Sequence, residues 1–288
     1  MRHRLTYRVW VSGILGKIWY VTGGVLACLS LGACSVSETA QPSSKTPTIV
    51  SLNPCIDAIL VEVAQPEQIL ALSHYSGDPN AASMDVSRAR EFGVTGGTAE
   101  EIIALQPDIV LASSFIAPAT RNALERLELN VATFGIASDA ETSAAQIREV
   151  AKLAGNTEGG EALIGRINAA LAKTPNGKPR SAILWQPGQI VPGSSALVSE
   201  LMAASGFSNH AASNGMGQAD YLSLEALLAN PPEVLLIAGD ASGQRHKALE
   251  QLPDTQIASF DPSLLYCAGP TIIRAMERLE DIREEAAI

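Results

Sequence analysis

The sequence predicts an α/β protein built from two Rossmann-like lobes, each with a parallel sheet, joined by a helical segment and leaving a ligand cleft between them. Short apolar runs alternate with segments of helical periodicity over residues 48–139 and again over residues 179–288, which is the pattern of a parallel sheet covered on both faces. Residues 140–178 have helical periodicity alone and end in a segment rich in proline and glycine. One motif also occurs once in each half of the chain, which favours a duplicated lobe.

The first 33 residues are predicted to be a secretory signal and not part of the fold. Basic residues occupy the first half of this segment, no acidic residue occurs in it, and an apolar stretch follows from Ile18 to Ala33. That stretch is shorter than the about 20 residues that span a bilayer, so a permanent transmembrane helix is the weaker interpretation.

Residues 31–34, Leu-Gly-Ala-Cys, resemble a bacterial lipobox, which implies that Cys34 carries lipid and becomes the mature N-terminus. Ordinary cleavage after a small residue is the alternative. Residues 34–47 are rich in Ser, Thr and Pro and are predicted to be a flexible tether. An acylated cysteine on such a tether would hold the protein at a membrane surface.

The charge balance excludes two classes of partner. The chain has 20 Lys and Arg against 30 Asp and Glu, a net charge of −10, and without the first 33 residues the balance is 16 against 30, or −14. The basic residues of this acidic body are scattered, unlike those of a nucleic-acid-binding protein or of a protein that adsorbs to anionic lipid. A hydrophobic content of 47% also excludes a disordered chain.

The first lobe is predicted to begin with a strand, a turn and a helix. Asn53 can cap that helix, and Pro54 suits its first position because no amide donor is needed there. A further helix is predicted over residues 120–127. Apolar runs predict strands at 49–52, 69–72, 109–112 and 131–134.

Two helices are predicted in the joint, with apolar faces over residues 144–153 and 163–171. The segment 174–179, Thr-Pro-Asn-Gly-Lys-Pro, ends the second of them. The alternating pattern then restarts, with runs at 181–185, 197–204, 225–229, 234–238 and 257–260 and a final helix that begins near Pro270.

The motif that occurs twice consists of a helix, a proline and a buried strand. Residues 98–111 align without a gap on residues 223–236, and each copy has a capping Ser or Thr followed two residues later by a glutamate, Glu100 or Glu225. One copy in each predicted lobe indicates duplication. The carboxyl ends of the strands in two such lobes would face a shared cleft.

The loops expected at this cleft are rich in aromatic, amide, hydroxyl and glycine residues and contain no Arg or Lys. Such a cleft suits a bulky, largely neutral ligand. For a single aromatic residue such as Tyr75 or Trp185, packing beneath a loop is the competing interpretation. The residues expected to bind the ligand are Asn53, Cys55, His74, Tyr75, Gly97, Phe115, Trp185, Gln186, Tyr221, Asp240, Tyr266 and Cys267.

No catalytic motif with supporting context occurs in the sequence. It has no Gly-x-Ser-x-Gly elbow and no His-Glu-x-x-His, and the histidines after the signal, His74, His210 and His246, are too far apart in sequence to predict a zinc site. Asp240 and His246 leave an envelope enzyme as an alternative. We therefore expect neither catalysis nor a cofactor or metal of the protein's own.

Residues 48–284 resemble the periplasmic substrate-binding proteins of ABC importers for cobalamin and iron–siderophore complexes, which have two lobes joined by a rigid helix. The resemblance implies a protein without catalytic residues that captures a ligand between its lobes and delivers it to a membrane permease and its ATPase. It is carried by Ile49-Val-Ser-Leu-Asn-Pro, Ile69–Pro79, Glu100–Leu111 and Gly269-Pro-Thr-Ile-Ile-Arg.

The same resemblance implies roles for individual residues. Family members dock onto arginines of the permease through one acidic residue on each lobe, and the matching positions are Glu100 and Glu225, although the helix dipole alone also explains a carboxylate in a first turn. Tyr75 matches the position where cobalamin-binding members place an aromatic ring. Heme binders offer a tyrosine to iron, so Tyr75 or His74 keeps heme as an alternative, whereas the absence of cleft arginines disfavours catecholate siderophores.

Cys55 and Cys267 form an even pair once Cys34 carries lipid. Both are expected at corners that face the cleft, where they could ligate a soft metal or the metal of a bound complex, form a disulfide across the lobes, or remain two unrelated buried thiols.

We therefore expect an exported, lipid-anchored, monomeric protein of the cell envelope that binds a cobalamin-like or iron-chelate ligand. A heme or siderophore binder of the same family, an envelope enzyme and a sensory or structural lipoprotein without a transporter are the alternatives.

Overall fold

The computed structural model describes residues 46–285, except 174, 176, 241–243 and 245. The predicted secretory signal, the lipidation residue Cys34 and most of the predicted tether therefore lie outside the described residues. Among the helices that the structure describes, none is long and apolar enough to cross a membrane.

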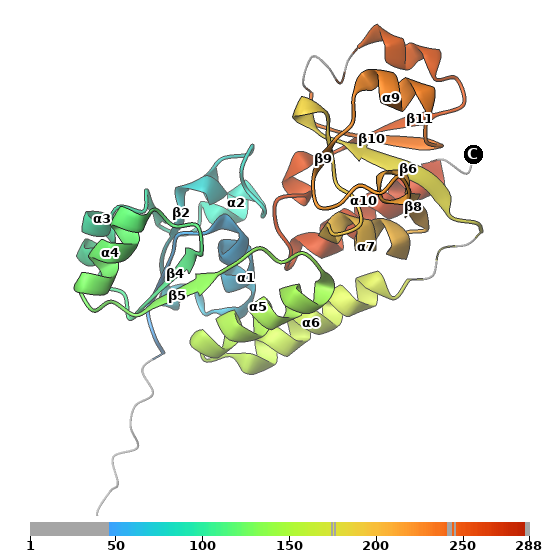
Figure 1. The fold of residues 1–288 in the computed structure, drawn as a ribbon. Helices are drawn as coiled ribbons and strands as arrows, with labels where there is room; N and C mark the ends of the chain where they lie inside the picture. The colour runs from blue at the N-terminus through green and yellow to red at the C-terminus, as the bar shows by residue number, and fades with distance from the viewer. Residues whose placement is uncertain (1–45, 174, 176, 241–243, 245, 286–288) are drawn as a thin grey trace, which may run out of the picture. The chain divides into compact units, whose positions relative to one another are not determined.

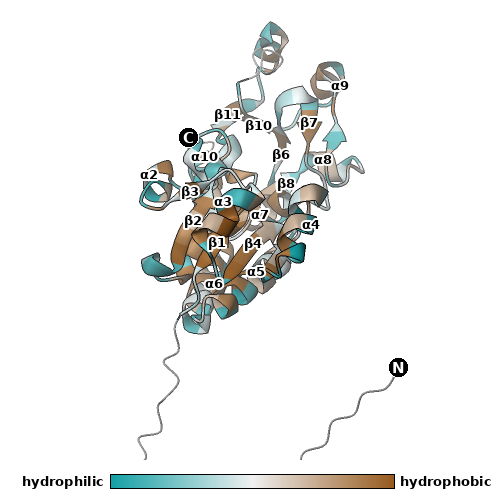
Figure 2. Ribbon diagram, turned by 90° about the vertical axis from the view of Figure 1, so that its left-hand side faces the viewer, coloured by the Kyte–Doolittle hydropathy of each residue, from teal (hydrophilic) through white to brown (hydrophobic). Residues whose placement is uncertain are grey.

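The N-terminal lobe contains a five-stranded sheet in which all strand pairs are parallel (Figure 1). In spatial order the strands are β3 (Val94–Thr95), β2 (Ile69–Ser73), β1 (Ile49–Ser51), β4 (Ile109–Ser113) and β5 (Val131–Phe134). Strands β1, β2 and β4 have the colour of hydrophobic residues in Figure 2, whereas hydrophilic residues occur on the helices around them. The helical elements are α1 (Pro54–Val63), η1 (Pro66–Gln68), η2 (His74–Gly77), α2 (Val86–Ala89), α3 (Ala99–Leu105) and α4 (Pro118–Arg126).

Helix α1 begins as the sequence predicts. The side chain of Asn53 accepts a hydrogen bond of 3.0 Å from the Cys55 amide, and Pro54 occupies the first helical position. The buried face of the helix then enters the core through Ile56, Ile59 and Leu60. This fixes Asn53 and Cys55 at the carboxyl end of β1, the edge of a parallel sheet where ligand-binding loops gather.

Helices α5 (Ala140–Leu153) and α6 (Thr157–Leu171) join the two lobes. The absence of a side chain at Gly160 lets these two helices pack closely. A Cβ at Gly160 would lie only 2.5 Å from the Cβ of Ala151. Helix α6 also contacts α1 of the first lobe and α10 (Thr271–Glu285) of the second. One continuous core of buried apolar residues accordingly runs from β1 and α1 through both linker helices into α10.

The C-terminal lobe contains a four-stranded parallel sheet and a separate antiparallel pair of short strands. The sheet order is β11 (Gln256–Phe260), β10 (Val234–Ala238), β6 (Arg180–Trp185) and β8 (Phe207–Asn209), and the pair is β7 (Ile190–Val191) with β9 (Asp220–Tyr221). Besides α10, the helical elements are η3 (Pro187–Gln189), α7 (Leu197–Ala204), α8 (His210–Ser213), α9 (Leu224–Ala229), η5 (Lys247–Gln251) and η6 (Pro262–Leu264).

The two sheets share one strand order. The order β2-β1-β4-β5 in the first lobe corresponds to β8-β6-β10-β11 in the second. The repeated motif occupies equivalent places, because Thr98 caps α3 before β4 and Ser223 caps α9 before β10. The shared strand order and the equivalent places of the repeated motif support duplication of a lobe.

The short strands are where sequence and structure differ. Strand β8 pairs with β6, yet it holds a single apolar residue, Phe207, so no apolar run marks it. Strands β3, β7 and β9 have only two residues each, too few to form an apolar run.

One ionisable residue, Asp57 on α1, is fully buried in the first lobe. One carboxyl oxygen accepts hydrogen bonds from the Ser73 amide (3.0 Å) and the Ser76 hydroxyl (2.6 Å), and the other is buried without a hydrogen-bond partner. Burial raises the pKa of Asp57 to about 7, although the nearby Ser51 hydroxyl and the hydrogen bonds from Ser76 and Ser73 oppose the rise. The carboxyl group thus ties α1 to the corner between β2 and η2.

We predict that Asp57→Asn flattens the pH dependence of stability. Because the folded-state pKa is raised, the neutral carboxyl stabilises the fold at low pH, and this contribution is lost as the pH rises through about 7. Between pH 5 and pH 8 the wild type should lose about 3 kcal/mol of unfolding free energy that the Asn variant keeps. Urea unfolding of both proteins at the two pH values measures the difference, and parallel losses would contradict the assignment.

Candidate ligand-binding site

A cavity of about 260 Å³ lies between the two lobes, and loops of both lobes and the linker line it. In the first lobe and the linker its lining residues are Asn53, Cys55, Ser113, Phe115, Gly135, Ile136, Ala137, Ser138 and Gln146. In the second lobe they are Gln186, Pro192, Ala196, Leu197, Val198, Gln218, Leu265, Tyr266, Cys267 and Ala268.

The first-lobe wall consists of loops that follow β1, β4 and β5. Ser113 ends β4, and its hydroxyl accepts a hydrogen bond of 3.1 Å from the Phe115 amide, which fixes the corner that carries Phe115. Phe115 and Ile136 are exposed over 74% and 71% of their surface. Large apolar side chains left this exposed beside a cavity indicate a surface that a ligand covers.

The second-lobe wall combines the loop after β6 with two segments that pack on each other. Gln186 follows β6 directly, and its amide donates a hydrogen bond of 2.8 Å to the Ile190 carbonyl. The Ser194 amide donates to the Met216 carbonyl over 2.9 Å, which joins the segment at Pro192 to the segment at Gln218. Tyr266, half-exposed, completes this wall.

A disulfide bond between Cys55 and Cys267 forms part of the cavity wall and links the two lobes. Of the three arrangements that the sequence leaves open, the structure therefore shows the covalent one. Neither sulfur is a free thiolate, so the pair does not ligate the metal of a bound complex in this form.

The lining of the cavity is electrically neutral, because none of its described residues is Asp, Glu, Lys, Arg or His. Its polar groups are the amides of Asn53, Gln186 and Gln218, the hydroxyls of Ser113 and Ser138 and the Tyr266 phenol, while the Gln146 amide donates to the Gly135 carbonyl at 2.8 Å. Within the described part of the chain, no group of three or more His, Cys, Asp or Glu side chains could hold a metal ion.

The structure brings half of the predicted ligand-binding residues to this cavity. These are Asn53, Cys55, Phe115, Gln186, Tyr266 and Cys267. The other six, His74, Tyr75, Gly97, Trp185, Tyr221 and Asp240, are not among its lining residues.

The structure corrects the prediction that Trp185 contacts the ligand. Its side chain is only 1% exposed, and its indole nitrogen donates a hydrogen bond of 3.3 Å to the Leu222 carbonyl. Trp185 therefore packs in the core beneath the β7–β9 pair, which is the competing interpretation that the sequence allowed for a single aromatic residue.

The remaining five residues lie on the surface or in neighbouring corners. His74 and Tyr75 belong to η2, and their rings contact each other with centroids 4.0 Å apart. The Tyr221 hydroxyl donates a hydrogen bond of 3.2 Å to the Gln189 side chain. Gly97 has a φ of +81° in the turn before α3. Asp240 is exposed after β10.

The enzyme alternative gains no support from the cavity. His246 caps η5, where its Nδ1 atom accepts a hydrogen bond of 3.1 Å from the Ala248 amide. Neither His246 nor Asp240 is among the cavity's lining residues.

Ile136 is the clearest candidate site residue that sequence reasoning missed. It lies two residues after Phe134, the last residue of β5, whose apolar run the sequence does show. The carboxyl end of that strand was a signal for a cleft loop, and an apolar residue in such a loop was a candidate for ligand contact. Gln146 carries no such signal because it lies within helix α5.

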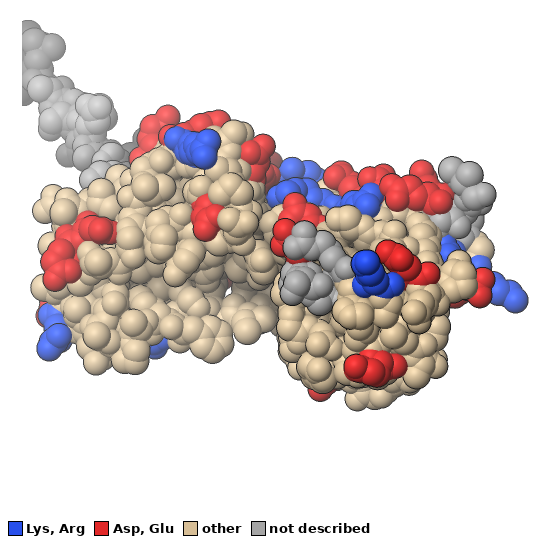
Figure 3. All heavy atoms as spheres, turned by 90° about the horizontal axis from the view of Figure 1, so that it is seen from above, with Lys and Arg blue, Asp and Glu red and all other residues tan. Residues whose placement is uncertain are grey.

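Glu100 and Glu225 lie in the first turns of α3 and α9, and both are exposed. In the first lobe the neighbouring Glu101 makes the local contacts, accepting hydrogen bonds from Thr95 (2.7 Å) and Gly96 (2.6 Å). Hydrogen bonds from its own backbone amide and from Ser223 lower the pKa of Glu225. In the face shown in Figure 3, acidic side chains occur on both lobes and are separated by broad uncharged areas.

Comparison with known proteins identifies similar folds. A model of the family described as periplasmic binding protein matches residues 49–262. The structure of the periplasmic heme-binding protein RhuT from Roseiflexus sp. RS-1 in apo form is similar with a TM-score of 0.64 and 22% identity, over 84% of this chain and 100% of that chain.

Two structures from Vibrio cholerae are similar as well. The periplasmic heme-binding protein HutB has a TM-score of 0.66 and 18% identity, over 83% of this chain and 99% of that chain. The periplasmic vitamin B12 binding protein BtuF has a TM-score of 0.58 and 17% identity, over 84% and 98%. No curated protein sequence matches the chain. At these identities the likeness to solved structures establishes the fold.

We predict that Gly193→Ala destabilises the second-lobe wall. A Cβ at Gly193 would lie 2.0 Å from the Met216 carbonyl oxygen, so the backbone of the Gln218 segment would have to move. The melting temperature of Gly193→Ala should fall below that of the wild type, whereas that of the control Gly165→Ala should rise. Gly165 lies within α6, and its would-be Cβ would meet no atom within 4 Å beyond its chain neighbours and the backbone of its own helix. Alanine there should stabilise the helix by about 0.5–1 kcal/mol. Equal melting temperatures for Gly193→Ala and wild type would refute the contact.

Proposed function

Because the chain belongs to the periplasmic binding protein family, we propose that it captures a large, uncharged metal complex of the cobalamin type between its lobes and delivers it to an ABC importer. The family's members are periplasmic solute-binding proteins that work with an ABC permease and its ATPase. The observation that carries the choice of ligand is the neutral lining of the interlobe cavity.

The neutral lining separates two ligand classes that both occur among the similar structures. HutB is named as a heme binder and BtuF as a vitamin B12 binder. Heme carries two carboxylates, and placing them against a surface without Arg, Lys or His leaves their charge uncompensated. An uncharged complex meets amides and hydroxyls that can exchange hydrogen bonds with it, from Asn53, Gln186 and Gln218.

The size of the cavity determines how such a ligand would lie. A volume of about 260 Å³ is below the about 300–1,000 Å³ of a typical ligand site, so a macrocycle inserts one edge and leaves the rest outside. Phe115 and Ile136 of one lobe and Tyr266 of the other extend the apolar surface beyond the cavity. These side chains cover the part of the macrocycle that remains outside the cavity.

Heme binding is the second candidate because of Tyr266. Among the described lining residues its phenol is the only side chain of a type that commonly ligates ferric heme iron. A heme bound through Tyr266 would show an iron–phenolate spectrum, whereas a corrinoid would keep its own visible bands.

The proposed function is tested by equilibrium dialysis of the purified protein against cyanocobalamin and, separately, hemin. We expect saturable binding of cyanocobalamin and weaker binding of hemin. Saturable hemin binding with an iron–phenolate band would instead establish the second candidate. Turnover of either compound would favour an enzyme.

The docking and anchoring roles extend this proposal. Glu100 and Glu225 occupy equivalent positions of two duplicated lobes, so a permease with one basic residue facing each lobe could pair with both. A lipid on Cys34 would keep the protein, as a monomer, at the membrane that holds the permease.

We predict that Phe115→Ala and Tyr266→Ala each weaken cyanocobalamin binding about tenfold, because each removes a ring from the ligand-covering surface. Tyr266→Phe keeps the ring and should bind cyanocobalamin as the wild type does, while losing any heme spectrum. The matched control is Tyr75→Ala, because Tyr75 is as exposed as Tyr266 (49%) but does not line the cavity. Isothermal titration measures all four, and an equal loss in Tyr75→Ala would place the site elsewhere.

We predict that the double variant Glu100→Lys/Glu225→Lys binds ligand normally and abolishes uptake, because charge reversal would repel basic residues of the permease. The control is Glu125→Lys/Glu250→Lys, which changes the net charge equally at exposed residues of α4 and η5. Radiolabelled cyanocobalamin uptake in cells is the measurement. Normal uptake by the first variant, or equal loss in the control, would disprove docking through these residues.

A further inference from the structure

The two lobes meet at a second place besides the linker helices, where residues 267–271 of the second lobe contact the first lobe and α5. The disulfide holds the Cα atoms of Cys55 and Cys267 5.1 Å apart. The Ser83 hydroxyl donates to the Cys267 sulfur over 2.7 Å, and the Thr271 hydroxyl donates to the Ser83 carbonyl over 2.9 Å. We call Cys55, Ser83 and residues 267–271 the interlobe junction.

The interlobe junction is closely packed. Cys267, Ser83 and Thr271 are all buried. Gly269 has a φ of +68°, and a Cβ there would lie 2.9 Å from Cγ1 of Ile59 on α1. Its amide donates to the hydroxyl of the buried Ser143 on α5 over 2.9 Å. The junction therefore leaves the lobes no room to slide past each other without breaking packed contacts.

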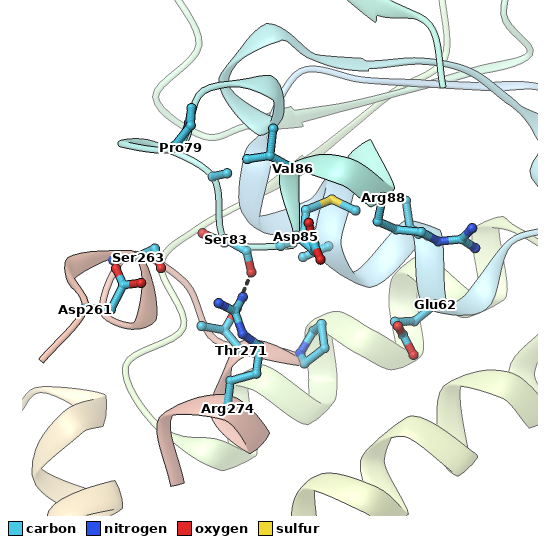
Figure 4. A pocket seen from close by; sticks show the side chains of 15 residues that line it. Glu62, Pro79, Ser83, Asp85, Val86, Arg88, Asp261, Ser263, Thr271 and Arg274 are labelled. Atoms are coloured by element: carbon cyan, nitrogen blue, oxygen red, sulfur yellow. Dashed lines mark hydrogen bonds between the residues drawn. The ribbon is translucent and has the colours of Figure 1, made fainter. Parts of the chain in front are cut away.

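The junction separates two cavities. Cys267 and Ala268 line the ligand cavity, whereas Pro270 and Thr271 line a second cavity of about 610 Å³ between α2 and the start of α10. Figure 4 shows this second cavity, with the hydrogen bond between Ser83 and Thr271 at its wall. The covalent bond between the lobes is thus part of the wall of the ligand cavity.

We propose that the Cys55–Cys267 disulfide is a positioning element that sets the separation of the two cavity walls. The packed linker helices hold the lobes together through the shared core, and the disulfide adds a second, covalent attachment in the wall of the ligand cavity itself. Phe115 on one wall and Tyr266 on the other, one residue from Cys267, are thereby held at a fixed spacing. Preorganised walls lower the entropy lost on binding; this last step rests on the proposed function.

The test of the lobe geometry needs no ligand. Spin labels on keto amino acids at Glu125 of α4 and Ala226 of α9, both exposed, report the distance between the lobes by double electron–electron resonance. We expect one narrow distance distribution in the wild type and a broader or shifted one in Cys55→Ser/Cys267→Ser. The control Ser83→Ala removes a hydrogen bond but keeps the disulfide, and it should stay narrow.

Reduction of the folded wild type provides a second arm. A water-soluble phosphine gives two electrons to the S–S bond and becomes the phosphine oxide with oxygen from water, and the two sulfurs take up two protons as thiols. Reduction should broaden the distribution as the Ser variant does. Unchanged distributions in both arms, or unfolding in both, would overturn the positioning role.

A binding arm connects the junction to the ligand. Cyanocobalamin should dissociate about tenfold faster from the double Ser variant than from the wild type. An unchanged dissociation rate with a broadened distribution would overturn the effect on the site. If the wild type does not bind cyanocobalamin, the proposed function fails, while the distance measurement still decides whether the disulfide fixes the lobes.

Discussion

The packing of α6 against both α1 and α10 is the constraint on which the rest of the structure depends. Neither lobe closes its own core at this side, because the buried face of α1 and that of α10 are both covered by the linker helices. The apolar area that stabilises each lobe is therefore shared with its neighbour. The cavity exists between the lobes because this shared core fixes their carboxyl-edge loops opposite each other.

The distribution of charge fits a protein that uses different forces at different surfaces. The body carries an excess of acidic residues, yet the described lining of the interlobe cavity carries none. Exposed carboxylates in equivalent first turns of α3 and α9 suit recognition of a basic partner at long range. Amides, hydroxyls and exposed rings suit close contact with a ligand that brings no charge to be compensated.

The sequence predicted site residues where a strand ends and the chain turns immediately. Gln186 follows a central strand directly and Asn53 follows one after a single residue, so knowledge of the strand was sufficient to place them at the cleft. Tyr75 also follows a strand, but the short helical turn η2 carries its ring to a position outside the cavity lining. Trp185 ends β6 itself, and the alternation of a strand turned its side chain into the core.

The sequence by itself determined the two-lobe α/β organisation, the helical joint and the repeated motif, because hydrophobic periodicity, caps and prolines act within a few residues of one another. The tertiary structure alone decided that Cys55 bonds to Cys267, which lies 212 residues away, and that Ile136 and Gln146 join Phe115 at one cavity. Such pairings depend on how α1, α6 and α10 pack. That packing sums many weak apolar contacts between distant segments, and no local pattern in the chain encodes the sum.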